Sequence, residues 1–227
     1  MSDRTLDRIG ALCGILWFPF LFAAFSLVAQ AAPQGGPTSN QEIARILAAP
    51  PPAQAWVGEY VYALAALMFL VFTTRLWALL WRAEGGRGWL SVTVLGAGLL
   101  YVALKFPQHA ALHVLWMRAG HGLDVQAGAA LWDTHQDLLL ASLYFNALMT
   151  AATAVVVLRK LALPRWLGWA AVACSVLLLA GVITRTFELA FPFGFWVMAA
   201  GVMLFLRTEP PLVADRAVTA PVAASPQ

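Results

Sequence analysis

Six long apolar runs constrain this chain more than any other feature of its sequence. They extend over residues 9–31, 56–81, 89–104, 137–158, 166–184 and 187–206. A helix needs about 20 apolar residues to cross the hydrocarbon core of a bilayer, where it satisfies its own backbone polar groups. The runs are continuous, whereas membrane strands alternate apolar and polar residues. The sequence therefore predicts an all-α fold, a polytopic membrane helix bundle with six transmembrane helices.

The composition agrees with a bilayer as the surrounding solvent. Hydrophobic residues make up 61% of the 227 residues and charged residues 11%, whereas soluble domains carry about 25% charge. A soluble chain of this length could not bury so much apolar surface. The formal net charge of +3 is spread over the loops, so the chain has no basic patch for nucleic acid. The lipid bilayer is the predicted partner, and nucleic acid is not.

Basic residues are distributed unevenly over the two sides of the predicted bundle. With the N-terminus inside, the inner side holds Arg4, Arg8, Arg75, Arg82, Arg87, Arg159, Lys160, Arg165, Arg207 and Arg216. The outer side holds Arg45, Lys105, Arg118 and Arg185. This bias predicts a protein of the bacterial cytoplasmic (inner) membrane with the N-terminus and the C-terminus both cytoplasmic. Arg75 lies near the end of its run, where its stem is expected to snorkel to the interface, and Glu84 is expected in the inner loop that follows.

The chain is predicted to contain one folded domain. Residues 1–208 form a transmembrane helical domain, and residues 209–227, rich in Pro, Ala, Ser and Val without a period, are predicted to be a disordered cytoplasmic tail. Ala29-Gln30-Ala31 resembles a signal-peptidase site. The apolar run before it is longer than the roughly 7–15 apolar residues of a signal peptide. We therefore expect the first run to be retained as a span.

Local signals predict where several helices begin. Ser39 and Glu42 form a capping box ahead of an apolar pattern, which predicts a short amphipathic helix outside the membrane. Thr134 and Asp137 have the same spacing and are predicted to cap the start of the fourth span. Pro192 is expected in the first turn of a short sixth span.

Ionisable residues gather at the predicted outer end of the bundle. The set is Glu59, Lys105, His109, Asp133, Asp137, Arg185 and Glu188. Charges in a low dielectric are usually paired or hydrated, so we expect these groups to form one cluster. Glu59, about one turn inside its span, is expected to pair with Lys105 or Arg185. Two interpretations stay open: a site for a small-molecule or lipid ligand, and an ion-pair network that fixes the order of the helices.

All four histidines of the chain lie between the third and fourth spans. His109 and His113 are four positions apart, on one helix face, and His135 would supply a third imidazole. A catalytic zinc site needs three protein ligands and a water, but no H-E-x-x-H motif occurs. Interfacial histidines that face lipid headgroups are the alternative. No cofactor is expected unless these histidines bind zinc or another divalent metal.

Three stretches carry a resemblance to a known family. They are Arg8-Ile9-Gly10-Ala11-Leu12 at the first span, Leu131–Asp137 before the fourth and Leu163-Pro164-Arg165-Trp166-Leu167-Gly168 at the fifth. With them the chain resembles, over nearly its whole length, the bacterial six-helix membrane proteins classed as domain of unknown function 4386. The resemblance implies the architecture and no activity, so no catalytic residue follows from it.

The sequence favours binding over catalysis without assigning an activity. The leading interpretation is a multi-pass membrane protein that binds or senses a small or lipophilic ligand, or assists a membrane protein partner, through the polar cluster on the outer side. The alternative is a membrane-embedded metal-dependent hydrolase or transferase with His/Asp ligands. The sequence contains no Gly-rich phosphate loop, G-x-S-x-G elbow or C-x-x-C pair.

Overall fold

The computed structural model describes residues 3–32, 39–85 and 88–207. Its long helices are α1 (Asp3–Val28), α3 (Ala53–Glu84), α4 (Trp89–Arg118), α5 (Val125–Lys160), α6 (Arg165–Thr184) and α7 (Phe191–Leu206). Shorter helices are η1 (Ala29–Ala31), α2 (Asn40–Leu47) and η2 (Phe187–Ala190). Within these residues, six helices are long and apolar enough to cross a membrane, counting η2 with α7. The predicted all-α bundle of six membrane helices is confirmed, and the predicted tail at 209–227 lies outside the described residues.

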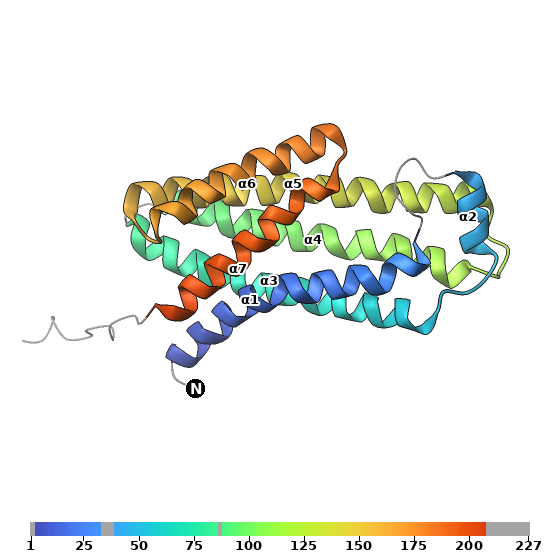
Figure 1. Ribbon diagram of the computed structural model, residues 1–227, viewed down its shortest axis with the longest axis horizontal. Helices are drawn as coiled ribbons and strands as arrows, with labels where there is room; N and C mark the ends of the chain where they lie inside the picture. The colour runs from blue at the N-terminus through green and yellow to red at the C-terminus, as the bar shows by residue number, and fades with distance from the viewer. Residues whose placement is uncertain (1–2, 33–38, 86–87, 208–227) are drawn as a thin grey trace, which may run out of the picture.

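The six long helices form a closed ring. Helix α1 packs against α3 and α7, α4 packs against α3 and α5, and α6 packs against α5 and α7 (Figure 1). Each helix therefore has two neighbours around the ring, and α3 also contacts α5 across it. The ring encloses a single large apolar core, with Trp17, Phe69 and Phe193 in mutual ring contact.

Helix length divides the bundle into a membrane part and a distal lobe. Helix α6 has 20 residues, as does the span formed by η2 and α7, so each is about 30 Å long, the thickness of a hydrocarbon core. Helices α3, α4 and α5 have 32, 30 and 36 residues and continue past the turn between α6 and η2 (Figure 1). We call these extensions, together with α2, the distal lobe, and the opposite end of the bundle, where α1 begins, the proximal end.

The distal lobe has its own core. Ile43 of α2 packs with Leu112 and Trp116 of α4 and with Trp132 of α5. The Trp116 indole N–H donates to the carbonyl of Ala31, 3.1 Å away, and ties the end of α1 to the lobe. The predicted amphipathic helix is confirmed as α2.

Two local signals are confirmed at the ends of helices. The Ser39 hydroxyl caps α2 by accepting from the backbone N–H of Glu42 at 3.2 Å. Pro192 lies in the first turn of α7, where its missing N–H leaves no helical hydrogen bond unmade.

The predicted start of the fourth span at Thr134 and Asp137 is wrong. Helix α5 begins at Val125, and the Asp124 carboxylate caps it by accepting from two backbone N–H groups. The Thr134 hydroxyl instead donates to the carbonyl of Ala130 inside the helix. The apolar run begins about three turns after the helix itself begins. The apolar pattern thus identified the helix but missed its polar first turns.

Glu84 also departs from expectation, because it is the last residue of α3 rather than a loop residue. Its carboxylate accepts from the backbone N–H groups of Leu90 and Ser91 and from the Ser91 hydroxyl, at 3.2, 2.9 and 2.6 Å. Glu84 therefore caps the start of α4 and fixes the turn between the two helices.

Candidate functional site

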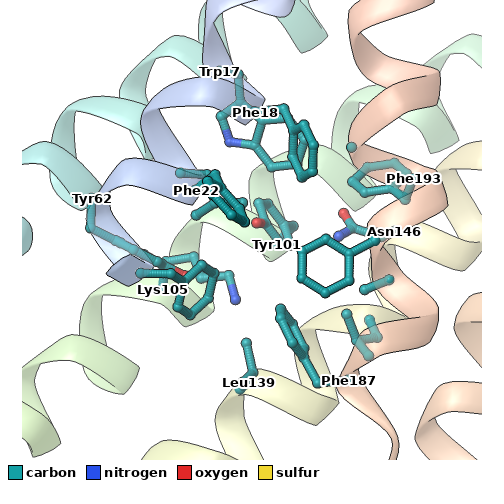
Figure 2. A pocket seen from close by; sticks show the side chains of 16 residues that line it. Trp17, Phe18, Phe22, Tyr62, Tyr101, Lys105, Leu139, Asn146, Phe187 and Phe193 are labelled. Carbon is teal, nitrogen blue, oxygen red and sulfur yellow. The ribbon is translucent and has the colours of Figure 1, made fainter. Parts of the chain in front are cut away.

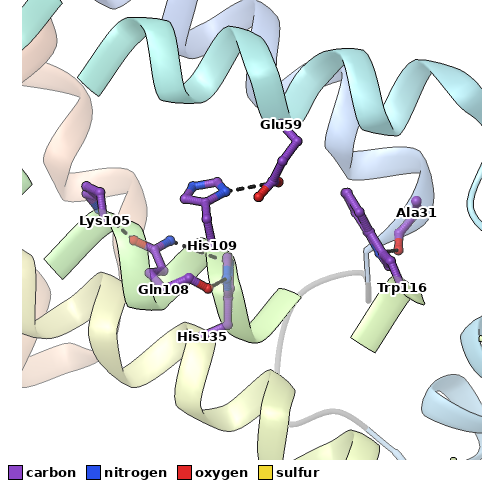
Figure 3. A network of polar contacts seen from close by, with 7 residues as sticks. All are labelled: Ala31, Glu59, Lys105, Gln108, His109, Trp116 and His135. Atoms are coloured by element: carbon purple, nitrogen blue, oxygen red, sulfur yellow. Dashed lines mark hydrogen bonds and ion pairs between the residues drawn. The ribbon is translucent and has the colours of Figure 1, made fainter. Parts of the chain in front are cut away.

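A network of polar side chains lies between α3, α4 and α5, where the membrane part meets the distal lobe (Figure 3). The His109 Nδ1 is 3.0 Å from the Glu59 Oε2, and both side chains are mostly buried. The His109 ring also lies against the ring of Tyr62, with centroids 3.6 Å apart. The predicted partners of Glu59 were Lys105 and Arg185, and the structure gives it His109 instead.

Lys105 stands at the other end of this network. Its ammonium nitrogen donates to the Gln108 Oε1 and to the Ser142 hydroxyl, each at 2.9 Å. The same nitrogen lies 4.8 Å from the centre of the Tyr101 ring, a cation–π distance. Lys105 is only 3% exposed, and among the described residues no carboxylate forms an ion pair with it. A buried amine with neutral partners alone is costly to keep charged.

Gln108 connects Lys105 to His135. The Gln108 Nε2 is 3.5 Å from the His135 Nε2, and the His135 Nδ1 is 2.9 Å from the backbone carbonyl of Gln108. A carbonyl can only accept, so the proton of this imidazole belongs on Nδ1. The Gln108 amide then donates to the bare Nε2, which makes His135 neutral. This arrangement also orients the Gln108 oxygen toward Lys105 (Figure 3).

The structure brings together part of the predicted cluster and separates the rest. Glu59, Lys105 and His109 share the network. Asp137 and Arg185 form a separate exposed pair at 3.9 Å. Asp133 and Glu188 are exposed as well.

The periodicity of α5 explains this division. Its inward face carries Trp132, His135, Leu139 and Ser142, all buried. Asp133 and Asp137 fall on the opposite face, since residues of a helix share a face only at spacings of three or four. The expectation of one cluster ignored this geometry, because it placed the start of α5 at Asp137.

The three histidines proposed as metal ligands do not converge on one point. His113 is exposed, and its ring lies 5.1 Å from the Trp56 ring. The His109 and His135 rings are 6.0 Å apart, and both nitrogens of His135 already have partners. Within residues 3–32, 39–85 and 88–207, no three His, Cys, Asp or Glu side chains are placed to hold a metal ion together.

A narrow cavity lies inside the ring beside Lys105 (Figure 2). Aromatic side chains form most of its wall: Trp17, Phe18, Phe22, Phe25, Tyr62, Tyr101, Phe187, Phe191 and Phe193. Leu21, Leu139, Leu143 and Ala190 add aliphatic groups to the lining, and Lys105 and Asn146 add polar groups. Figure 2 shows the Lys105 nitrogen directed into the space between Phe22, Phe187 and Leu139.

The cavity is slender and borders on lipid. Its volume is about 30 Å³, which is room for roughly two waters. Phe22 of α1 and Phe191 of α7 belong to its wall and are 56% and 37% exposed on the outside of the bundle. The wall between α1 and α7 is therefore made of side chains that also face the membrane.

Reasoning from the sequence missed Gln108, Ser142 and the aromatic wall. Gln108 stands three positions after Lys105, on the same helix face, and this spacing was the available signal. The aromatic residues gave none, because aromatic side chains are frequent in any apolar span.

The comparisons with known proteins found no matching family model, no matching curated protein and no matching solved structure. The resemblance to the proteins of domain of unknown function 4386 therefore stays a prediction.

Proposed function

We propose that this protein binds a lipophilic acid, with the acidic head at Lys105 and the hydrocarbon chain in the aromatic cavity. The observation that carries the proposal is the Lys105 ammonium group, which is buried at the cavity wall with neutral partners. A carboxylate or a similar anion would supply the missing counter-charge. The same anion would make charge-assisted hydrogen bonds, which are about twice as strong as neutral ones.

The shape and lining of the cavity support the same class of ligand. The cavity as it stands has room for roughly two waters, so an acyl chain would enter it along the aromatic wall only after side chains of that wall rotate. Exposed side chains such as Phe22 change rotamer within picoseconds to nanoseconds, and such a change can open this path. The wall between α1 and α7 faces lipid, so the ligand would enter from the membrane.

The polar network gives the site a connection to the distal lobe. Lys105, Gln108 and His135 are linked by successive contacts, and Glu59 and His109 lie beside them. An acid that draws the Lys105 ammonium group away from Gln108 would free the Gln108 amide and alter the contact with His135. A ligand can shift a conformation only through such differential contacts. Binding and sensing are therefore served by the same residues.

The basic residues at the proximal end support an inner-membrane orientation with this end in the cytoplasm. The cavity would then lie in the leaflet that faces the periplasm. The metal-dependent hydrolase or transferase receives no support from the separate positions of the three histidines.

The test is quenching of tryptophan fluorescence by a long-chain fatty acid brominated at mid-chain, compared with its methyl ester. Trp17 lines the cavity, so a Trp17→Phe variant identifies its share of the signal among the 10 tryptophans of the chain. We expect saturable quenching of Trp17 by the acid and much weaker quenching by the uncharged ester. Equal quenching by acid and ester would show that Lys105 recognises no acid.

A further inference from the structure

A second hollow lies at the proximal end of the bundle, far from Lys105. Four arginines line it: Arg4 and Arg8 of α1, Arg75 of α3 and Arg207 at the end of α7. The other charged residue in the lining is Asp7. We call this hollow the basic pocket. Its volume is about 130 Å³, which is room for on the order of ten waters.

Positive charge predominates in the described lining of the basic pocket, which contains four guanidinium groups and one carboxylate. The one carboxylate is already engaged, because the Asp7 Oδ1 is 3.0 Å from the Arg75 Nε. Arg75 does not snorkel to the interface as expected, since its side chain is only 6% exposed and turns inward to Asp7.

Neutral groups hold two of the remaining arginines in place. The guanidinium carbon of Arg8 lies 5.8 Å from the centre of the Phe205 ring. The Arg207 Nη1 donates to the backbone carbonyl of Ala162, 2.6 Å away. A bias of basic residues toward one side of a membrane requires no convergence of this kind. Here three helices bring their arginines to one hollow.

Guanidinium groups that converge around a hollow suit a phosphate group. Arginine binds phosphate oxygens through two parallel N–H donors, and basic pockets between membrane helices bind anionic lipid headgroups. Phe205 adds an apolar group to the lining of the basic pocket, and its side chain is 37% exposed. This side chain would lie along an acyl chain. We propose that the basic pocket binds the phosphate headgroup of an anionic phospholipid.

The experiment uses the full chain in detergent and follows its thermal unfolding. Dioctanoyl phosphatidylglycerol, dioctanoyl phosphatidylcholine and inorganic phosphate are titrated separately. We expect phosphatidylglycerol to raise the unfolding temperature saturably, and the other two to raise it little. An equal effect of inorganic phosphate would identify a site for the free anion and overturn the lipid assignment. No saturable effect of phosphatidylglycerol would overturn the site itself.

Variants separate the basic pocket from the general charge of the proximal end. Arg8→Gln with Arg207→Gln removes two pocket charges, and we expect phosphatidylglycerol to bind roughly thirtyfold more weakly. Arg159→Gln with Lys160→Gln removes two exposed charges near the same end, outside the pocket lining, and should leave the affinity unchanged. If both double variants bind phosphatidylglycerol equally weakly, the effect comes from surface charge and not from the basic pocket. If the first pair does not fold, Arg4→Gln alone should weaken binding about fivefold, and an unchanged affinity would contradict the proposal.

Discussion

Lys105 is a buried amine in a membrane helix that pairs with no described carboxylate. Its hydrogen bonds to Gln108 and Ser142 and the ring of Tyr101 stabilise it, but burial of a charged group opposes them. Residues that are needed for binding often lower stability in this way. A Lys105 variant is therefore expected to keep its stability and to lose the bound acid.

We expect the free energy of unfolding of Lys105→Met to lie within about 1 kcal/mol of the parent value. The substitution loses two hydrogen bonds of about 1 kcal/mol each, but it also removes a buried charge, and the two effects offset each other. The free energy of unfolding, measured in detergent by circular dichroism, checks this. A loss of several kcal/mol would make Lys105 a structural residue and weaken its assignment to a ligand.

Glu59 gives a second test at the scale of the residue. Glu59→Gln removes the negative partner of a largely buried His109, so the unfolding free energy should fall by about 1–2 kcal/mol. Glu188→Gln is the matched control, since Glu188 is exposed and its change should stay within about 0.5 kcal/mol. Glu84 is unsuitable as a control because it caps α4. Similar losses for Glu59 and Glu188 would show that the pair with His109 contributes nothing.

Helix α7 is held to α1 by a close approach of their backbones at Gly201. A Cβ atom at Gly201 would lie 2.8 Å from the backbone nitrogen of Ile15 and 2.9 Å from the carbonyl oxygen of Ala11. These atoms belong to helix backbone and cannot rotate away. Small residues at such contacts allow membrane helices to pack closely.

Gly201→Ala should therefore lower the free energy of unfolding by about 1–3 kcal/mol through overpacking. Gly96→Ala is the control within another span, because no atom lies within 4 Å of the added Cβ. That substitution should leave stability unchanged or raise it by up to about 1 kcal/mol, the usual difference between Gly and Ala in a helix. If both variants unfold alike, the contact between α1 and α7 is looser than described.

At the scale of the element, the sequence predicted membrane helices better than helix ends. Continuous apolar runs identified every span, since a bilayer imposes that pattern directly. The start of α5 was missed because its first three turns lie in the distal lobe, where Gln126, Asp133 and Thr134 are exposed and polar. Spacing alone predicted which residues share one face of α4. It did not predict contacts between helices, because the pairing of Glu59 with His109 depends on the orientation of α3 and α4 about their own axes.

The whole molecule is a ring of six long apolar helices with the distal lobe at one end. The ring positions the aromatic cavity at the level of the α6–η2 turn, and the basic pocket lies at the opposite end. If the basic bias sets the orientation, the distal lobe faces the periplasm and the basic pocket the cytoplasm.

The orientation can be measured by cysteine labelling in intact cells. With Cys13 and Cys174 replaced by alanine, Gln126→Cys in the distal lobe should react with a membrane-impermeant maleimide. Arg159→Cys at the proximal end should react only after the membrane is permeabilised. Labelling of Arg159→Cys in intact cells would show that the protein has the opposite orientation.

The central claim is that the Lys105 side chain recognises the acidic head of a lipophilic ligand inside the ring. Native mass spectrometry of the full chain, mixed with a long-chain fatty acid, measures this most directly. The parent protein and Lys160→Met should each retain one acid molecule at the same low concentration, and Lys105→Met should retain none. Equal retention of the acid by Lys105→Met and the parent protein would contradict the claim.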